Sequence, residues 1–363
     1  MNDLAAFGTV FDGIEPYAGT PPPGFYADWL GAMTDARFRV YLGMRPEDMG
    51  GNEVQTRLPR IEDGEGWFES VNQVEAAREA RGRFVMVTLG ACYGAQAVGS
   101  YLALKKLNPM PYKLVAVEPE PVNLSWVERH FRDNGIDPDE QWLIGSAIGA
   151  TNEPTLFPVG APGSGAQSCI TTNASNARAA YAWALTSSGE RAKTALRNLL
   201  LTNSTGIKKN LHSGEETDAD LVGRPHPALW ARRMASRVAR YRRGGAGDKP
   251  ADPDFFDAEI KLVSTITLRD VLSPFDRVDY LEADIQQSEI FVIPPFMDLL
   301  KRKVRRVHIG THGAEVHASL ADLFQREGWR LVFNFPPNSE NSTPGGIFTL
   351  NDGVLTVVND GLD

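Results

Sequence analysis

An alternation of strand and helix patterns between residues 84 and 149 constrains the fold more than any other feature. FVMVT, residues 84–88, is apolar and β-branched, as in a strand covered on both faces of a parallel sheet. A glycine turn follows, and then apolar residues recur at helical spacing. The order repeats in KLVAVEP (113–119), NLSWVERHFRDNG (123–135) and WLIGSAIG (142–149). Strand, helix, strand, helix, strand predicts a doubly wound α/β fold.

The remaining sequence divides around this core. Residues 1–66 are rich in Pro, Gly and Asp and predict an N-terminal extension that wraps the core. The first half of the core is expected over 67–159, where WFESVNQVEAAREA opens with helical spacing. Residues 160–256 carry several helix-like patterns and predict a helical insertion that could form a lid or a partner surface. The second half of the core is expected over 257–363.

Two further strands and a terminal hairpin complete the predicted sheet. VDYLEADI (278–285) and VRRVHIGTH (304–312) are expected as strands, and ASLADLFQREG as a helix. WRLVFNF (329–335) and GVLTVVN (353–359) are expected to pair as a hairpin.

Composition narrows the class of protein and partner. The net charge of -9 argues against general attraction to nucleic acid or an anionic membrane. No stretch approaches the ~20 apolar residues of a membrane helix, and the start lacks a basic region followed by an apolar core. Cys92 and Cys169 are too few for a disulfide framework or a cysteine-based zinc site. We therefore expect a cytoplasmic protein with neither nucleic acid nor membrane as a partner.

The glycine turn after the first strand predicts a nucleoside site. Gly90 and Gly94 frame the segment GACYG, and the next helix begins there. A dinucleotide fingerprint would need glycines where Cys92 and Ala95 stand, so a pyrophosphate-containing cofactor is disfavoured. Glu118 ends the second strand, where an acid can accept hydrogen bonds from ribose hydroxyls. S-adenosylmethionine has a ribose but no pyrophosphate, and it fits this combination.

The order of these motifs resembles the FkbM family of S-adenosylmethionine-dependent methyltransferases. The resemblance covers residues 67–150 and 262–359, and is carried by WFESVNQVEAAREARGRF, LGACYG, VEPEPVNL, NGIDP, LEADIQQSE, RVHIGTH and DGVLTVVN. It implies a Rossmann-like class I methyltransferase sheet that uses S-adenosyl-L-methionine as its cofactor. It also implies O-methylation of a hydroxyl on a small-molecule acceptor, such as a sugar or a secondary metabolite.

The resemblance also assigns the residues that contact the cofactor. They belong to the turn, to the end of the second strand and to the adenine side: Thr88, Gly90, Ala91, Gly94, Glu118, Pro119, Ser146 and Ala147. Thr88 stands where the family usually has an acid, and Glu69 could supply that charge or be an ordinary helical glutamate. Of the family motif K-x-D-x-E-G-x-E, only Asp284 and Glu289 are present. These departures leave an alternative open, a noncatalytic partner or regulatory protein with the methyltransferase fold.

The reacting end is expected near the ends of the fourth and fifth strands. Asp284 ends the fourth strand, and His308 and His312 lie four residues apart on the fifth, with Gly310 leaving space between them. We expect Asp284 and His312 to be catalytic, with His312 as the base and Asp284 as its orienter or as an acceptor ligand. A divalent metal held with Glu289 is a less favoured alternative, because the spacing matches no tight metal motif. His308, deeper in its strand, is expected to be structural.

Overall fold

The computed structural model describes residues 4–42, 44–159, 259–343 and 346–362. The helical insertion expected over 160–256 lies outside the described residues. None of the described helices is long and apolar enough to cross a membrane.

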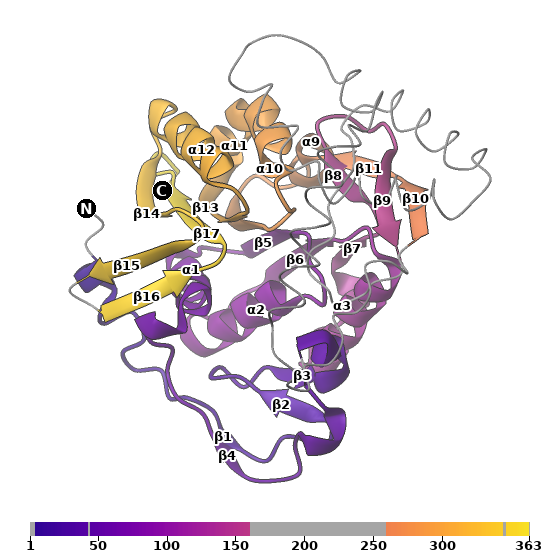
Figure 1. The fold of residues 1–363 in the computed structure, drawn as a ribbon, viewed down its shortest axis with the longest axis vertical. Coiled ribbons are helices and arrows are strands. Elements are labelled where there is room, and N and C mark those ends of the chain that lie inside the picture. The colour runs from indigo at the N-terminus through magenta and orange to yellow at the C-terminus, as the bar shows by residue number, and fades with distance from the viewer. Residues whose placement is uncertain (1–3, 43, 160–258, 344–345, 363) are drawn as a thin grey trace, which may run out of the picture.

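A seven-stranded sheet forms the centre of the molecule (Figure 1). Its strand order is β14-β17-β13-β12-β5-β6-β7, and only β17 runs antiparallel to its neighbours. The bounds are β5 Phe84–Leu89, β6 Tyr112–Val117, β7 Trp142–Ile144, β12 Val278–Ala283, β13 Val304–Thr311, β14 Arg330–Phe335 and β17 Gly353–Val358. This arrangement confirms the predicted α/β fold with a Rossmann-like class I methyltransferase sheet.

Helices cover both faces of the sheet (Figure 1). One face carries α1 (Glu65–Glu79), α2 (Ala95–Leu107) and α3 (Pro121–Asp133). The other face carries α9 (Leu268–Leu272), α10 (Glu289–Val292), α11 (Met297–Lys303) and α12 (Ala314–Arg326), with the 3-10 turn η8 (Pro294–Phe296) between α10 and α11. Successive strand residues point to opposite faces of the sheet. Because helices cover both faces, every residue of β5 is buried, and its sequence does not alternate between apolar and polar residues.

The N-terminal extension packs against the face covered by α1, α2 and α3. Its elements are η1 Leu4–Phe7, β1 Ala18–Gly19, β2 Phe25–Ala27, β3 Met33–Asp35, η2 Ala36–Leu42, η3 Pro46–Asp48, β4 Val54–Gln55 and η4 Ile61–Asp63. Phe11 and Trp29 join the hydrophobic core of this face. Phe38 stacks on Trp126 of α3 and meets His130 edge-on. The extension therefore shares a core with α1–α3, while a domain boundary at residue 66 stays a prediction.

The single strand predicted over 142–149 is wrong, because the chain leaves the main sheet after β7. The short strand β8 (Ala147–Gly149) pairs in parallel with β11 (Thr265–Thr267) in a separate two-stranded sheet. Ser146 and Ser264 stabilise this departure, with their hydroxyl oxygens 2.8 Å apart. β9 (Thr155–Val159) and β10 (Glu259–Val263) then pair antiparallel. The 3-10 turn η5 (Pro138–Glu140) precedes β7.

The predicted terminal pair has a second hairpin inserted in it. β14 and β17 pair antiparallel, as expected for WRLVFNF and GVLTVVN. Between them, β15 (Ser339–Thr343) and β16 (Gly346–Leu350) form their own two-stranded sheet. Figure 1 shows this hairpin as two long yellow arrows beside α1. Phe348 and Leu350 bury their side chains in the α1 core, so the hairpin closes one end of that face.

Candidate functional site

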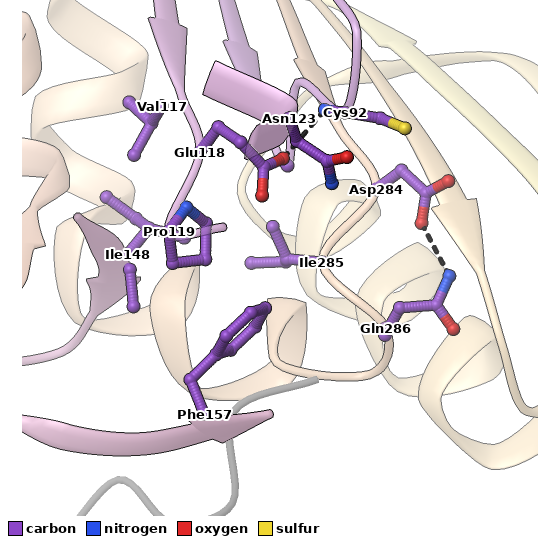
Figure 2. A pocket seen from close by; sticks show the side chains of 12 residues that line it. Cys92, Val117, Glu118, Pro119, Asn123, Ile148, Phe157, Asp284, Ile285 and Gln286 are labelled. Carbon is purple, nitrogen blue, oxygen red and sulfur yellow. Dashed lines mark hydrogen bonds between the residues drawn. The ribbon is translucent and has the colours of Figure 1, made fainter. Parts of the chain in front are cut away.

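A pocket opens beyond the carboxyl ends of β5, β6 and β12 (Figure 2). Ligands bind at this edge in open α/β sheets. The empty volume is about 590 Å³, which includes the part open to solvent. The lining residues come from both halves of the core: Gly90, Cys92, Val117, Glu118, Pro119, Asn123, Ala147, Ile148, Phe157, Asp284, Ile285 and Gln286.

The turn after β5 requires glycine at position 90. Gly90 has φ of +80°, a conformation that side chains disfavour. A Cβ there would lie 2.1 Å from the carbonyl oxygen of Asp284. Because that oxygen belongs to the backbone, a side-chain rotation could not relieve the clash. The turn and the end of β12 are therefore packed against each other. Gly94, with φ of +82°, closes the turn and precedes α2.

Glu118 is held in the pocket wall by two backbone amides. Its side chain is 4% exposed, and it accepts hydrogen bonds from the N–H of Cys92 at 2.7 Å and of Glu120 at 2.9 Å. Burial raises the pKa of Glu118 to about 7, although these hydrogen bonds favour the charged form. The Asn123 side chain also donates to this carboxylate, and its two oxygens can accept about four hydrogen bonds in all. The acid is thus oriented and still able to accept hydroxyl groups.

Apolar side chains form the opposite part of the wall. Ala147 and Ile148 come from β8, and Phe157 comes from β9. Figure 2 shows Phe157 and Ile148 on the side of Glu118 away from Cys92, with Pro119 between. A flat apolar ring could lie against this wall while a polar sugar faces Glu118. The pocket therefore combines an apolar surface with a carboxylate that can accept hydrogen bonds.

Thr88 belongs to a buried polar row across the sheet. Its hydroxyl donates to Glu282 of β12, and it is 1% exposed. The register continues this row from Glu282 to His308 on β13 and to Thr356 on β17. Burial raises the pKa of Glu282 well above its usual range. Thr88 is thus engaged within the sheet and does not line the pocket.

Asp284 and His312 meet at the other end of the pocket. His312 Nε2 lies 3.4 Å from Asp284 Oδ1 and 3.7 Å from Asp352 Oδ1. The Gln286 amide nitrogen lies 2.7 Å from His312 Nε2 and donates to Asp284 Oδ1 at 3.0 Å. Burial and the nearby Asp352 raise the pKa of Asp284 above its usual range. The structure therefore brings together the two residues expected to be catalytic.

Further carboxylates surround this end of the pocket. Burial, together with the charges of Glu69, Asp284 and Asp352, raises the pKa of Glu65 to about 9. Burial also raises the pKa of Glu69, while a hydrogen bond from Gln96 and the charge of Arg39 oppose that shift. Both glutamates project from α1, one turn apart. Sequence reasoning considered Glu69 as a source of negative charge, and the structure places it in this acidic group.

His308 has a structural environment, as expected from the sequence. Its Nδ1 lies 2.9 Å from Thr356 Oγ1 and 3.1 Å from Asn72 Nδ2. Burial lowers the pKa of His308 to about 3, so the ring is neutral. Gly310 lies between His308 and His312, and a Cβ there would be 3.6 Å from a Glu65 oxygen. The missing side chain leaves room for the acidic group.

The remaining cofactor residues predicted from the resemblance lie around the pocket. Pro119 and Ala147 line it directly. Ala91, Gly94 and Ser146 do not line the pocket themselves, but they are adjacent along the chain to lining residues or lie within the same turn. Sequence reasoning missed Asn123, Phe157 and Gln286, because their positions depend on how separate segments meet. Asn123 offered one local signal, since it lies only five residues after Glu118.

Comparisons with known proteins give weak structural likenesses. No protein-family model and no curated protein matches the sequence. A methyltransferase FkbM from Methylobacillus flagellatus KT aligns with 83% of this chain at 10% identity and a TM-score of 0.34. The chain spans 56% of that protein's length. The delta-N METTL16 MTase domain aligns with 80% of this chain and 81% of its own length, at 8% identity and a TM-score of 0.32. The fold assignment therefore rests on the strand order itself.

Proposed function

We propose that this protein is an S-adenosylmethionine-dependent methyltransferase that methylates a hydroxyl of a small-molecule acceptor, such as a sugar or a secondary metabolite. The observation that carries the proposal is the placement of Glu118. Two backbone amides, one of them from Cys92 in the turn after Gly90, hold its carboxylate at the end of β6. An acid at this position can accept both hydroxyls of a ribose.

The pocket offers a partner for each part of the cofactor. Glu118 would accept the ribose hydroxyls, and Ala147, Ile148 and Phe157 would contact the adenine ring. Asp284, together with the acidic residues of α1, would face the positively charged methionine end. The absence of a Cβ at Gly90 lets the turn pack closely against the backbone of Asp284 at the edge of the pocket. When bound, S-adenosylmethionine supplies an electrophilic methyl group on a positively charged sulfur.

The residues at Asp284 would position the acceptor. Methyl transfer is an in-line displacement, so holding the acceptor oxygen against the methyl carbon supplies much of the rate. The acceptor hydroxyl forms its new bond to carbon while the carbon–sulfur electron pair stays on sulfur. The hydroxyl proton must leave, and in the absence of a bound metal ion His312, whose Nε2 lies 3.4 Å from Asp284 Oδ1, would accept it. Gln286 would turn aside, because its amide now lies against both groups.

Calorimetric titration with S-adenosylhomocysteine tests the cofactor site without a known acceptor. Glu118→Gln keeps the size of the side chain but removes its charge, and should weaken binding by the ~1.5 to 3 kcal/mol of a charged hydrogen-bonding partner. Glu128→Gln is the matched control, because Glu128 lies on the outer side of α3 and pairs with Arg132. Equal affinity of wild type and Glu118→Gln, or no binding by wild type at millimolar ligand, would contradict the proposal.

A separate assay distinguishes the enzyme from a noncatalytic relative. Incubation with S-adenosylmethionine labelled in its methyl group, in the presence of hydroxylated small molecules, should give a labelled product. Cofactor binding without transfer to any acceptor would favour a regulatory or partner protein that has kept the fold.

A further inference from the structure

Three metal-ligand side chains meet beside the pocket. Asp284 follows β12, Glu289 begins α10 and His312 follows β13, so they converge from three separate elements. One oxygen or nitrogen from each lies within 4.8 Å of those of the other two. Ligands held about 2.1 Å from one cation are roughly 3 to 4 Å apart. Small rotations of these side chains would therefore close them around an ion.

Two of these side chains have hydrogen-bonding capacity that the protein leaves unused. Glu289 is 0% exposed, and its Oε1 accepts the N–H of Ile285 at 2.8 Å. Its other oxygen, Oε2, is buried without a hydrogen-bond partner. The Nδ1 atom of His312 is also buried without a partner. A buried carboxylate oxygen without a partner is unfavourable, so Oε2 of Glu289 is a candidate ligand atom for a bound group.

Basic side chains balance only part of the charge around these residues. Within the described part of the chain, no lysine or arginine forms an ion pair with Asp284, Glu289 or Asp352. Glu65 and Glu69 add further carboxylates, and Arg39 supplies a positive charge near Glu69. Five carboxylates with one arginine remain repulsive when the acids are ionised. A divalent cation would remove this repulsion.

The amide of Gln286 marks where positive charge is favoured. Its nitrogen lies 2.7 Å from His312 Nε2 and 3.0 Å from Asp284 Oδ1, between two of the three candidate ligands. Figure 2 shows Gln286 reaching toward Asp284 along the pocket edge. An NH₂ group is the positive end of the amide dipole and occupies a point that two acceptors share. If Gln286 turned aside, a cation could take the same point.

We propose that Asp284, Glu289 and His312 bind a divalent metal ion. Two carboxylates and one imidazole suit first-row cations that accept both oxygen and nitrogen ligands, such as Mn²⁺ and Zn²⁺. Three protein ligands leave coordination positions open toward the pocket, because Asp284 also lines it. Binding of the ion stands on these side chains alone. Only its use in holding the acceptor oxygen rests on the proposed methyltransferase function.

A metal site explains more of the geometry than a pair made of a base and its orienting acid. In such a pair, the acid would bond one ring nitrogen of His312 while the other nitrogen faced the substrate. Here Asp284, Asp352 and the Gln286 amide all approach the same ring nitrogen, Nε2. The pair would also give no role to the unpaired oxygen of Glu289. With the ion bound, His312 is a ligand and does not act as the base.

Titration of the whole, chelator-treated chain with Mn²⁺ or with Zn²⁺ alone tests the site. Calorimetry should find one ion per chain, and Glu289→Gln and His312→Gln should each weaken binding at least tenfold. Glu289→Gln keeps an oxygen for the Ile285 N–H, so the loop should fold. Glu315→Gln is the control, because Glu315 is an exposed carboxylate three residues after His312 and should bind the ion like wild type.

Two variants separate this proposal from the cofactor site. Glu289→Gln should lose the metal and keep its affinity for S-adenosylhomocysteine, because Glu289 does not line the pocket. Glu118→Gln should show the reverse. The metal proposal is overturned if wild type binds neither ion stoichiometrically at millimolar concentration. It is also overturned if both Glu289→Gln and His312→Gln bind the ion as tightly as wild type.

Discussion

Buried acids at the two ends of the pocket differ in their hydrogen-bond partners. At one end, Glu118 has both carboxylate oxygens bonded to backbone amides that belong to the pocket wall. At the other end, Glu289 has a buried oxygen without a partner, and His312 has a buried nitrogen without one. The first end is complete before any ligand arrives. The second has unmet bonding capacity and an excess of negative charge.

This difference indicates what each end can bind. A carboxylate whose position is fixed by amides is suited to neutral hydroxyl groups, which need direction more than charge. A group of carboxylates with an unpaired imidazole nitrogen is suited to a cation. The two ends are in contact where Gly90 packs against the carbonyl of Asp284, so a change at this contact should affect both. Variants that act on one end or on both can therefore test whether the two ends differ as described.

The largest effect is expected from Gly90→Ala, which should damage both ends. The new Cβ would fall 2.1 Å from the Asp284 carbonyl oxygen, so the turn and the end of β12 must move apart. We expect loss of measurable S-adenosylhomocysteine binding by calorimetry, with a clear fall in the midpoint of thermal unfolding.

Gly328→Ala is the control for this variant. Gly328 has φ of +82°, and no atom lies within 4 Å of a Cβ built there. It should show only the backbone strain of about 1 to 2 kcal/mol in unfolding free energy and keep ligand affinity. Equal effects of the two variants would show that the contact with Asp284 is unimportant.

The next effect concerns stability, and it separates the two strand histidines. His308→Asn removes buried hydrogen bonds to Thr356 and Asn72, and should lower the unfolding free energy by about 1 to 3 kcal/mol. His312→Asn should change it little, because the native ring nitrogens make few hydrogen bonds. Urea unfolding of both variants at pH 7.5 measures the difference. A larger loss for His312→Asn would show that His312, and not His308, has the structural role.

The pH dependence of His308 has a definite sign. Its pKa is about 3 in the folded protein and near 6.5 in the unfolded chain, so only the unfolded chain binds a proton between these values. Wild type should therefore lose stability from this residue as the pH falls below about 6.5. His308→Asn should lack this component, and the gap between the two proteins should narrow toward acid pH. A gap that widens would contradict the assignment.

A smaller effect is expected on the pH dependence of cofactor affinity. The pKa of Glu118 is raised to about 7 in the ligand-free protein, and its ionised form accepts the ribose hydroxyls better. Affinity for S-adenosylhomocysteine should thus rise with pH through 7, by up to about tenfold per unit below that value. Glu118→Gln should flatten this rise. An identical pH profile for the variant would assign the dependence to another group.

The smallest effect is expected at the apolar wall. Phe157→Leu keeps most of the buried volume and removes the aromatic face. Ring–ring contacts contribute about 0.5 to 1.5 kcal/mol, so affinity should fall by roughly twofold to tenfold. Val117→Ile, on the Glu118 side of the pocket, controls for a small change in the volume of the wall. Unchanged affinity of Phe157→Leu would indicate that the adenine ring does not contact this wall.

Much of the fold could be predicted because short stretches of sequence carry the signals for its strands and helices. Strands buried on both faces are continuous apolar runs, and helices begin after glycine or proline signals. The break after β7 could not be predicted, because WLIGSAIG is apolar on both sides of Gly145 and Ser146. Its second part pairs with β11, more than 110 residues later. The hairpin of β15 and β16 was also missed, since SENST carries almost no apolar signal.

The site shows the same division between local and distant information. Gly90 and Glu118 could be predicted because each follows a clear strand at a characteristic position. Asp284 and His312 were identified from their places at strand ends, and the structure brings them together. Asp352 joins them only because the start of β17 pairs with the end of β13. Glu65 was missed because it opens α1 as an ordinary first-turn acid, far along the chain from β12.

A crystal structure with S-adenosylhomocysteine is the most direct test of the central claim, that this pocket holds the cofactor between Glu118 and Asp284. The account predicts both ribose hydroxyls within hydrogen-bonding distance of the Glu118 carboxylate. It also predicts the adenine ring against Ile148 and Phe157, and the amino-acid end directed toward Asp284. A ligand bound elsewhere, or one in this pocket without contact between its ribose and Glu118, would contradict the account.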